Sequence, residues 1–159
     1  MKNILRKLTF ILFCSVIVSL ASCDDDYPND GYLKVDDKSY TINDAVLTSV
    51  GYDDGYYQLR LTLDNTNAND AHSLNVLIYS QVKDYLPSAK YTPYLYDDNY
   101  HNKFKRAAWL VGNVEAGVIM EGSIKSTKNN DIYTIHADFV DTDGRKVIGE
   151  YKGEIKVLY

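Results

Sequence analysis

The residue with the most distinctive chemistry in this chain is Cys23, which follows Leu20-Ala21-Ser22. A cysteine at a signal-peptide cleavage site takes a thioether-linked diacylglycerol, and the amine that cleavage frees takes a further acyl chain such as palmitate. Ala21 and Ser22 are small, as a signal peptidase requires to hold the chain extended in its cleft. We therefore predict a lipoprotein signal peptide over residues 1–22 and lipid attachment at Cys23.

The residues before the cysteine agree with this prediction. Lys2, Arg6 and Lys7 form a positive start, and the uncharged run from Leu8 to Leu20 has 13 residues. That run is shorter than the roughly 20 residues that a membrane-spanning helix needs. Two or more acyl chains anchor a protein stably, at about 0.8 kcal/mol per buried methylene. The alternative is an ordinary secretory signal in which the cysteine is incidental.

Three acidic residues, Asp24, Asp25 and Asp26, follow the cysteine directly. They resemble the acidic signal that sends Bacteroidota lipoproteins to the outer face of the outer membrane. This resemblance implies a surface-exposed, outer-membrane protein with the membrane as its partner through the lipid. In enterobacteria an aspartate at this place means retention in the inner membrane instead, and a plain solvated spacer is a further alternative. We predict that residues 23–30 comprise the lipidated cysteine and an acidic tether.

A second group of residues is suited to binding rather than to covalent chemistry. It comprises Tyr94, Tyr96, Tyr100 and Trp109, whose faces stack on sugar rings while their polar tips make hydrogen bonds. If a strand persists past Pro93, Tyr94 and Tyr96 share one side and form a platform about 7 Å long at roughly 3.3 Å per residue. We predict a ligand site here. The alternative is that these rings pair across strands and pack inward, with Trp109 in the core.

Recognisable catalytic motifs are absent from the sequence. The three histidines are His72, His101 and His136, which have no metal-ligand spacing. Asp141-x-Asp143-Gly144 hints at a calcium loop, but Arg145 and Lys146 follow and would repel a cation, so a hairpin turn is the favoured interpretation. Because no nucleophile elbow or phosphate-binding loop is present, we predict no enzymatic activity, no metal and no cofactor. A hydrolase of unrecognised type is the alternative.

Charge and cysteine content exclude further classes. Residues 1–22 hold three of the 17 basic residues and none of the 22 acidic ones, so the mature part has 14 basic and 22 acidic side chains and a formal charge of −8. That balance argues against nucleic acid as a partner, since nucleic acid needs a basic footprint. Cys14 leaves with the signal and Cys23 takes lipid, so no disulfide is available.

The elements that must position these residues are strands. Polar and apolar residues alternate with a period of two over most of the mature chain, as in a half-buried sheet, and no window of 11 residues shows a helical stripe. Turn signals separate the runs: Asp36-Asp37-Lys38, Asp53-Asp54-Gly55, Lys128-Asn129-Asn130 and Asp141 to Gly144. The expected strands are 31–36, 39–50, 56–65, 73–82, 89–96, 106–114, 117–127, 131–140 and 146–158.

About nine antiparallel strands joined by hairpins predict an all-β fold, a single sandwich or a flattened barrel, over residues 31–159. The two ends of this domain resemble small all-β envelope lipoproteins of the Bacteroidota. The resemblance is carried by the opening Gly31 to Tyr40, by Gly122 to Ser126 and by the closing Asp141 to Ile155. It implies an envelope lipoprotein from a family largely without assigned function, and it supplies no catalytic residues.

These observations predict a lipid-anchored monomer that acts as a non-enzymatic binding module for a glycan or another envelope ligand. A structural role, in which a strand edge docks another envelope protein, is the alternative. Alternating Glu and Lys over 146–156 argue mildly against such an edge, because charges blunt pairing.

Overall fold

The computed structural model describes residues 29–65, 71–95, 99–112 and 115–159. Cys23, the acidic run 24–26 and Tyr96 lie outside the described residues. The described chain is all-β and contains no helix, as the alternating pattern predicts. Its strands are β1 (Asp30–Val35), β2 (Lys38–Ile42), β3 (Asp44–Asp53), β4 (Tyr56–Asp64), β5 (His72–Ser80), β6 (Ala89–Pro93), β7 (Lys103–Val111), β8 (Glu115–Asn129), β9 (Ile132–Asp141), β10 (Lys146–Glu154) and β11 (Lys156–Leu158).

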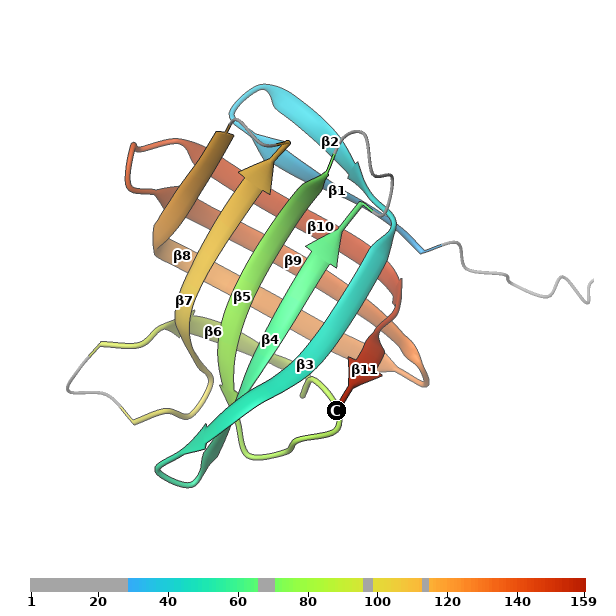
Figure 1. Ribbon diagram of the computed structural model, residues 1–159, viewed down its shortest axis with the longest axis vertical. Helices are drawn as coiled ribbons and strands as arrows, with labels where there is room; N and C mark the ends of the chain where they lie inside the picture. Colours follow the sequence, from blue (N-terminus) through green and yellow to red (C-terminus); the bar gives the residue numbers. More distant parts are fainter. Residues whose placement is uncertain (1–28, 66–70, 96–98, 113–114) are drawn as a thin grey trace, which may run out of the picture.

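The strands form one strongly curled sheet in the order β11-β3-β4-β5-β7-β6-β8-β9-β10-β1-β2. The curl brings two layers face to face, so that β3, β4, β5 and β7 lie in front while β1, β9 and β10 cross behind them (Figure 1). Alternate side chains of both layers point into the space between them, and the largest fully buried ones are Trp109, Tyr91, Tyr151, Phe104 and Phe139. The core is therefore closed by the sheet itself.

The expected all-β class is confirmed, whereas the finer expectation of about nine strands, all antiparallel, in a sandwich or flattened barrel is wrong in two respects. The sheet is mixed, because β6 pairs in parallel with β7 and β11 pairs in parallel with β3. Over the described residues it also has eleven strands, because two of the expected runs each divide where the chain passes from one layer to the other. The run 39–50 divides at Asn43, and the run 146–158 divides at Ile155.

The division at Asn43 has a visible cause. The Asn43 backbone N–H donates to the Asp64 carbonyl (3.0 Å), which turns the chain from the edge of β1 onto the edge of β4. The carboxylate of Asp44 then accepts from Lys156 Nζ (2.9 Å) on β11. The two crossings between layers are thus tied to each other by one ion pair.

Strand β6 fills a gap that opens between β7 and β8. These two strands pair only near their hairpin, through Ala107–Val111 and Glu115–Ile119. A bulge lies between Ile119 and Glu121, and Gly122 has a φ of 116°, which lets β8 bend into the rear layer. A side chain at Gly122 would overlap the Asp138 carbonyl oxygen. Because the partners diverge, β6 bonds to both of them.

The predicted turns are confirmed by backbone angles. Every predicted turn contains a positive φ value: Asp36 (50°), Asp54 (45°) with Gly55 (85°), Asn130 (54°) and Gly144 (79°). Asp, Asn and Gly tolerate this left-handed region better than other residues do. The charged strand β10 is not an edge, because it pairs with β1 on one side and β9 on the other, so its charges do not bear on edge docking.

Candidate functional site

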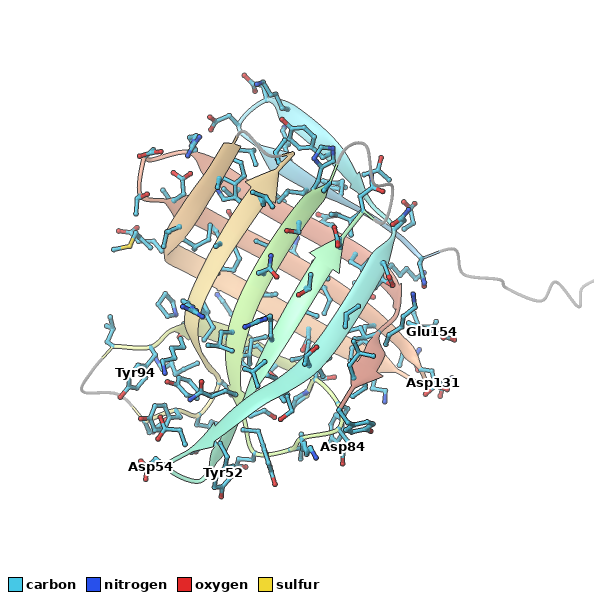
Figure 2. All side chains as sticks on the ribbon, in the orientation of Figure 1. Tyr52, Asp54, Asp84, Tyr94, Asp131 and Glu154 are labelled. Carbon is cyan, nitrogen blue, oxygen red and sulfur yellow. The ribbon has the colours of Figure 1, made fainter. Side chains whose placement is uncertain are left out.

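Four tyrosine rings from three separate segments meet at one end of the outer face of the front layer. Tyr100 lies 4.3 Å from Tyr79, 4.8 Å from Tyr94 and 5.6 Å from Tyr56 between ring centroids, and Tyr79 and Tyr94 lie 5.6 Å apart. We call these four residues the tyrosine cluster. Figure 2 shows Tyr94 at the same end of the molecule as Tyr52 of β3 and Asp54 of the β3–β4 turn.

The sheet and one loop position these rings. Tyr56 and Tyr79 point to the outer face of β4 and β5, out of phase with the buried leucines of those strands. Tyr94 follows β6, where its backbone N–H donates to the Phe104 carbonyl (2.9 Å), and Tyr100 precedes β7. Tyr79 is only 2% exposed because the other rings cover it, whereas Tyr56, Tyr94 and Tyr100 are half-buried.

The hydroxyl groups of the cluster influence one another. A side-chain hydrogen bond with Tyr94, together with burial and the charge of nearby Asp53, raises the pKa of Tyr100 to about 12. Burial, and next the charge of Asp53, also raises the pKa of Tyr79 above 10.0. Tyr79 and Tyr100 are therefore uncharged at neutral pH and offer phenol hydroxyls beside the carboxylate of Asp53.

The structure brings together two of the four ring residues that the sequence singled out. Tyr94 and Tyr100 stack at an interplanar angle of 25°. The expected strand past Pro93 is wrong, because β6 ends at Pro93, so the two-ring platform of Tyr94 and Tyr96 loses its basis. The sequence analysis missed Tyr56 and Tyr79, although both fall on the outward phase of their strands.

Trp109 is the other correction. Its side chain is 1% exposed and packs in the core, so it is no part of an exposed ring surface. Its indole Nε1 donates to Asp141 Oδ2 (3.1 Å), and the Arg145 guanidinium lies 4.7 Å from the ring centroid. The sequence alternative that Trp109 is a core residue is the correct one, since β7 faces inward at this position.

Asp141 is the centre of a closed polar network. Its carboxylate accepts from the backbone N–H groups of Asp143 and Arg145 (both 2.9 Å) and from Arg145 Nε (2.8 Å), besides the Trp109 indole. Burial by itself would raise the pKa of Asp141, but these hydrogen bonds outweigh it and hold the pKa below 3.8. The network secures the β9–β10 turn, which supports the hairpin interpretation of this motif over a calcium loop.

The histidines do not come together. His136 lies on the outer face of β9, more than half exposed, with Nδ1 at 3.2 Å from Glu150 Oε1. His72 is buried at the start of β5 against the ring of Tyr40, at 4.5 Å between centroids. Within the described ranges, no three His, Cys, Asp or Glu side chains are grouped as metal ligands would be. No helix in those ranges is long and apolar enough to cross a membrane.

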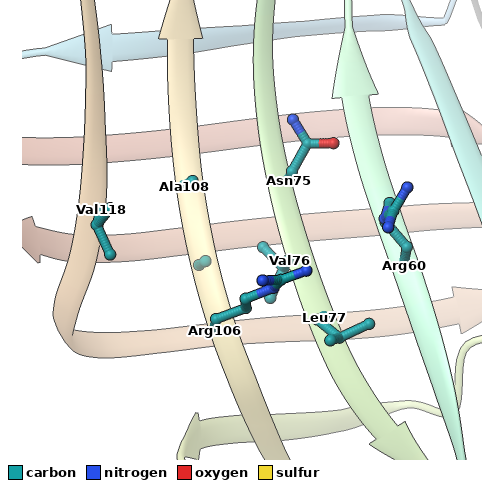
Figure 3. A pocket seen from close by; sticks show the side chains of 8 residues that line it. Arg60, Asn75, Val76, Leu77, Arg106, Ala108 and Val118 are labelled. Atoms are coloured by element: carbon teal, nitrogen blue, oxygen red, sulfur yellow. The ribbon is translucent and has the colours of Figure 1, made fainter.

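Two arginines that the sequence analysis did not single out lie on the outer face of the front layer. Arg60 on β4 and Arg106 on β7 border a depression of about 470 Å³, whose other lining residues are Asn75, Val76, Leu77, Ala107, Ala108 and Val118 (Figure 3). We call it the arginine depression. The alternation of Arg60 with the buried Leu59 and Leu61 is the signal that could have placed it on this face.

A smaller depression of about 290 Å³ contains Asp84, Asp131 and Glu154 together with Tyr85 and Tyr133. The chain's own Lys128 lies over both rings there, 5.6 Å from the centroid of Tyr85 and 5.3 Å from that of Tyr133. The ammonium group of Lys128 therefore already provides a positive charge in this smaller depression.

The chain matches no protein-family model, and no curated protein and no solved structure is significantly similar to it.

Proposed function

We propose that this chain is a lipid-anchored, non-enzymatic binding module of the cell envelope that takes a glycan at the tyrosine cluster. The observation that supports this proposal best is the convergence of Tyr56, Tyr79, Tyr94 and Tyr100 beside Asp53 at one end of the outer face. Ring edges and phenol hydroxyls next to a carboxylate suit the apolar faces and hydroxyl groups of a sugar.

The anchor is part of the proposal and rests on Cys23 and on the apolar run before it. We propose that the acidic run 24–26 directs the protein to the cell surface. Replacing the thiol acceptor, Cys23→Ala, should move the protein from the membrane fraction to the soluble fraction. A protein that stays membrane-bound after this change would show that the anchor lies elsewhere. Protection from protease added to intact cells would contradict the surface location.

The binding role is tested with neutral oligosaccharides. The native chain is screened on a glycan array, and each ligand found is titrated against Tyr94→Ala and Tyr100→Ala. Loss of one stacking ring should weaken binding about fivefold, because ring stacking contributes on the order of 1 kcal/mol. The matched control is Tyr159→Ala, which removes an exposed ring at the C-terminus and should leave affinity unchanged.

Folding must be measured in parallel. If Tyr94→Ala lowers the free energy of unfolding by several kcal/mol, as loss of a core aromatic does, the ring is a packing residue and the proposed site is wrong. If affinity for every glycan is equal in native protein, Tyr94→Ala and Tyr100→Ala, the cluster is likewise not the site.

A second function, docking of another envelope protein, is favoured by one observation. Leu110 on β7 and Val118 and Met120 on β8 are 38%, 53% and 60% exposed, and the strands that carry them are neighbours. Exposed apolar patches often mark interaction surfaces. Leu110→Glu, at a patch residue outside the lining of the arginine depression, should abolish recovery of a stoichiometric partner from native envelopes if this second function holds, and should leave glycan affinity unchanged if the first does.

A further inference from the structure

The arginine depression is built on three adjacent strands. Arg60 on β4 and Arg106 on β7 both pair in register with Leu77 on the central strand β5. Because neighbouring strands lie about 4.8 Å apart, the two arginine backbones are about 10 Å from each other. Leu77 is 7% exposed and lies between the two arginines (Figure 3). The site is thus an apolar floor with a guanidinium on either side.

Within the described part of the chain, neither guanidinium contributes a bond to the fold. The guanidinium groups of Arg60 and Arg106 have no hydrogen bond or ion pair with any described residue, and none of the residues that line the depression is acidic. This is unusual in a chain whose mature part has 22 acidic and 14 basic side chains. A guanidinium presents five N–H donors in a fixed fork that matches carboxylate, sulfate and phosphate oxygens. Two free forks on one face therefore favour an anionic ligand.

A neutral donor stands at the same site with its orientation fixed. Asn75 Oδ1 accepts from the Thr62 hydroxyl (2.9 Å), and Asn75 Nδ2 donates to Ser73 Oγ (3.0 Å). These two bonds hold the amide plane and leave the second N–H of Nδ2 for a ligand. Such an arrangement suits a sugar hydroxyl or ring oxygen next to the anionic group.

The depression and the tyrosine cluster lie next to each other along strand β5. Tyr79 follows Leu77 by two residues on the same face of β5, a separation of about 7 Å. One sugar residue spans a comparable length. A chain of sugars that contacts the tyrosine cluster would therefore pass over Leu77 between the two arginines.

We propose that Arg60 and Arg106 bind the carboxylate or sulfate groups of an acidic oligosaccharide, whose next sugar lies at the tyrosine cluster. This inference rests on the proposed glycan-binding function and names its substrate class. Attraction between the two positive groups and the anionic sugar gives selectivity over neutral glycans in an otherwise acidic protein.

The experiment compares three probes by calorimetric titration of the purified chain: oligogalacturonides, sulfated dextran oligomers and unsulfated dextran oligomers. The variants are Arg60→Gln, Arg106→Gln and Tyr100→Ala. The matched control is Lys125→Gln, which removes an exposed positive charge from the outer face of β8 in the rear layer. The preference between the first two probes identifies the anionic group as carboxylate or sulfate.

We expect an acidic probe to bind more tightly than unsulfated dextran. Each arginine variant should lower the affinity for the acidic probe about tenfold, and added salt should lower it further. Tyr100→Ala should weaken the same probe, while Lys125→Gln should not. Arg106→Lys should recover only part of the affinity, because an ammonium lacks the planar fork.

Two results would overturn the inference without touching the binding function. One is glycan binding that depends on Tyr100 but is equal in native protein and in both arginine variants. The other is equal affinity for inorganic sulfate and for the acidic oligomers, which would make the depression an adventitious anion site only. If instead the arginine variants weaken binding of an acidic probe and Tyr100→Ala does not, the tyrosine cluster is not a binding site. The proposed two-part site is then wrong as well. Binding of no probe at all, with no neutral glycan on the array either, would overturn both proposals.

Discussion

Arg145 in the β9–β10 turn and Arg106 on β7 lie on opposite faces of strand β7, and they differ in whether their guanidinium groups have partners. Arg145 reaches toward the buried side, where its guanidinium donates to Asp141 and Asp143 (2.8 and 2.7 Å) and covers the Trp109 ring. Arg106, on the outer side of β7, has no partner within the described part of the chain. The same chemical group is therefore consumed by folding in one place and left available in the other.

The difference follows from how the surrounding polar groups are satisfied. The Asp141 carboxylate receives four hydrogen bonds, and burying such a charge without them would cost several kcal/mol. Arg60 and Arg106 are exposed, so water satisfies their donors and the fold gains little from them. Substitutions in the closed network around Asp141 should therefore lower the free energy of unfolding. Substitutions of the open pair, Arg60 and Arg106, should affect only ligand binding.

The largest expected effect is that of Asp141→Asn. The amide removes the charge that Arg145 and the Trp109 indole contact, so we expect a loss of about 2–4 kcal/mol in the free energy of unfolding. Chemical denaturation at neutral pH measures it. The control is Asp143→Asn, which also contacts Arg145 but is 68% exposed and should cost less than about 1 kcal/mol. Equal losses in the two variants would contradict the closed network.

The pH dependence of stability, compared between the native chain and Asp141→Asn, tests the same network. The folded pKa of Asp141 lies below its ordinary 3.8, so its contribution is fully present above pH 3.8 and disappears as the pH falls through the lower folded value. The difference in Tm between the native chain and Asp141→Asn should therefore be constant above pH 3.8 and shrink below it. A difference that stays constant at lower pH would show that the charge of Asp141 contributes nothing.

A smaller loss is expected for Gly117→Ala, which tests the packing around the same network. A Cβ atom at Gly117 would overlap the Trp109 indole nitrogen and lie 2.6 Å from Asp141 Oδ2. We expect a cost of about 1–3 kcal/mol, since overpacking displaces neighbours that have no free space. Gly51→Ala, on β3, is the control, because its nearest contact would be 3.8 Å away on the Gln58 side chain. A wild-type Tm for Gly117→Ala would show that the indole and carboxylate move freely.

The smallest effect on stability should come from the open pair. Arg60→Gln combined with Arg106→Gln removes both guanidiniums of the arginine depression, and the free energy of unfolding should change by less than about 0.5 kcal/mol. Thermal and chemical denaturation check this. A loss of several kcal/mol would mean that the two stems hold Leu77 in place, and the two sides of β7 would then differ less than their hydrogen bonds indicate.

The local sequence pattern predicted the positions of strands and turns well, but it did not predict which strands pair or where the chain changes layers. Alternation located every strand region, and Asp54-Gly55 and Asn130 marked turns, because side-chain phase and positive φ depend on a few neighbouring residues. The same alternation does not reveal that a strand changes layers at Asn43 or Ile155. Those breaks arise from bonds to distant residues, such as the Asp64 carbonyl.

The candidate site could be predicted from the sequence only in part, for the same reason. Tyr94 and Tyr100 stood out as rings in an irregular segment, and they do meet. Trp109 stood out equally, yet it faces the core, where its indole donates to the carboxylate of Asp141, a residue on a different strand. Arg60 and Arg106 are 46 positions apart in the chain, and only the pairing of both strands with β5 makes them neighbours across Leu77.

By itself the sequence determined the all-β class, the turns and the inward or outward phase of most strands, since these follow from residue type over short distances. It also carries the features on which the proposed lipid anchor rests. Tertiary structure alone decided the curled mixed sheet, the insertion of β6 between β7 and β8, the closure of Asp141 onto Trp109 and Arg145, and the exposure of an arginine pair beside four tyrosines. Each of these depends on register between strands far apart in the chain, which is set by the packing of the whole sheet and by no short stretch of residues.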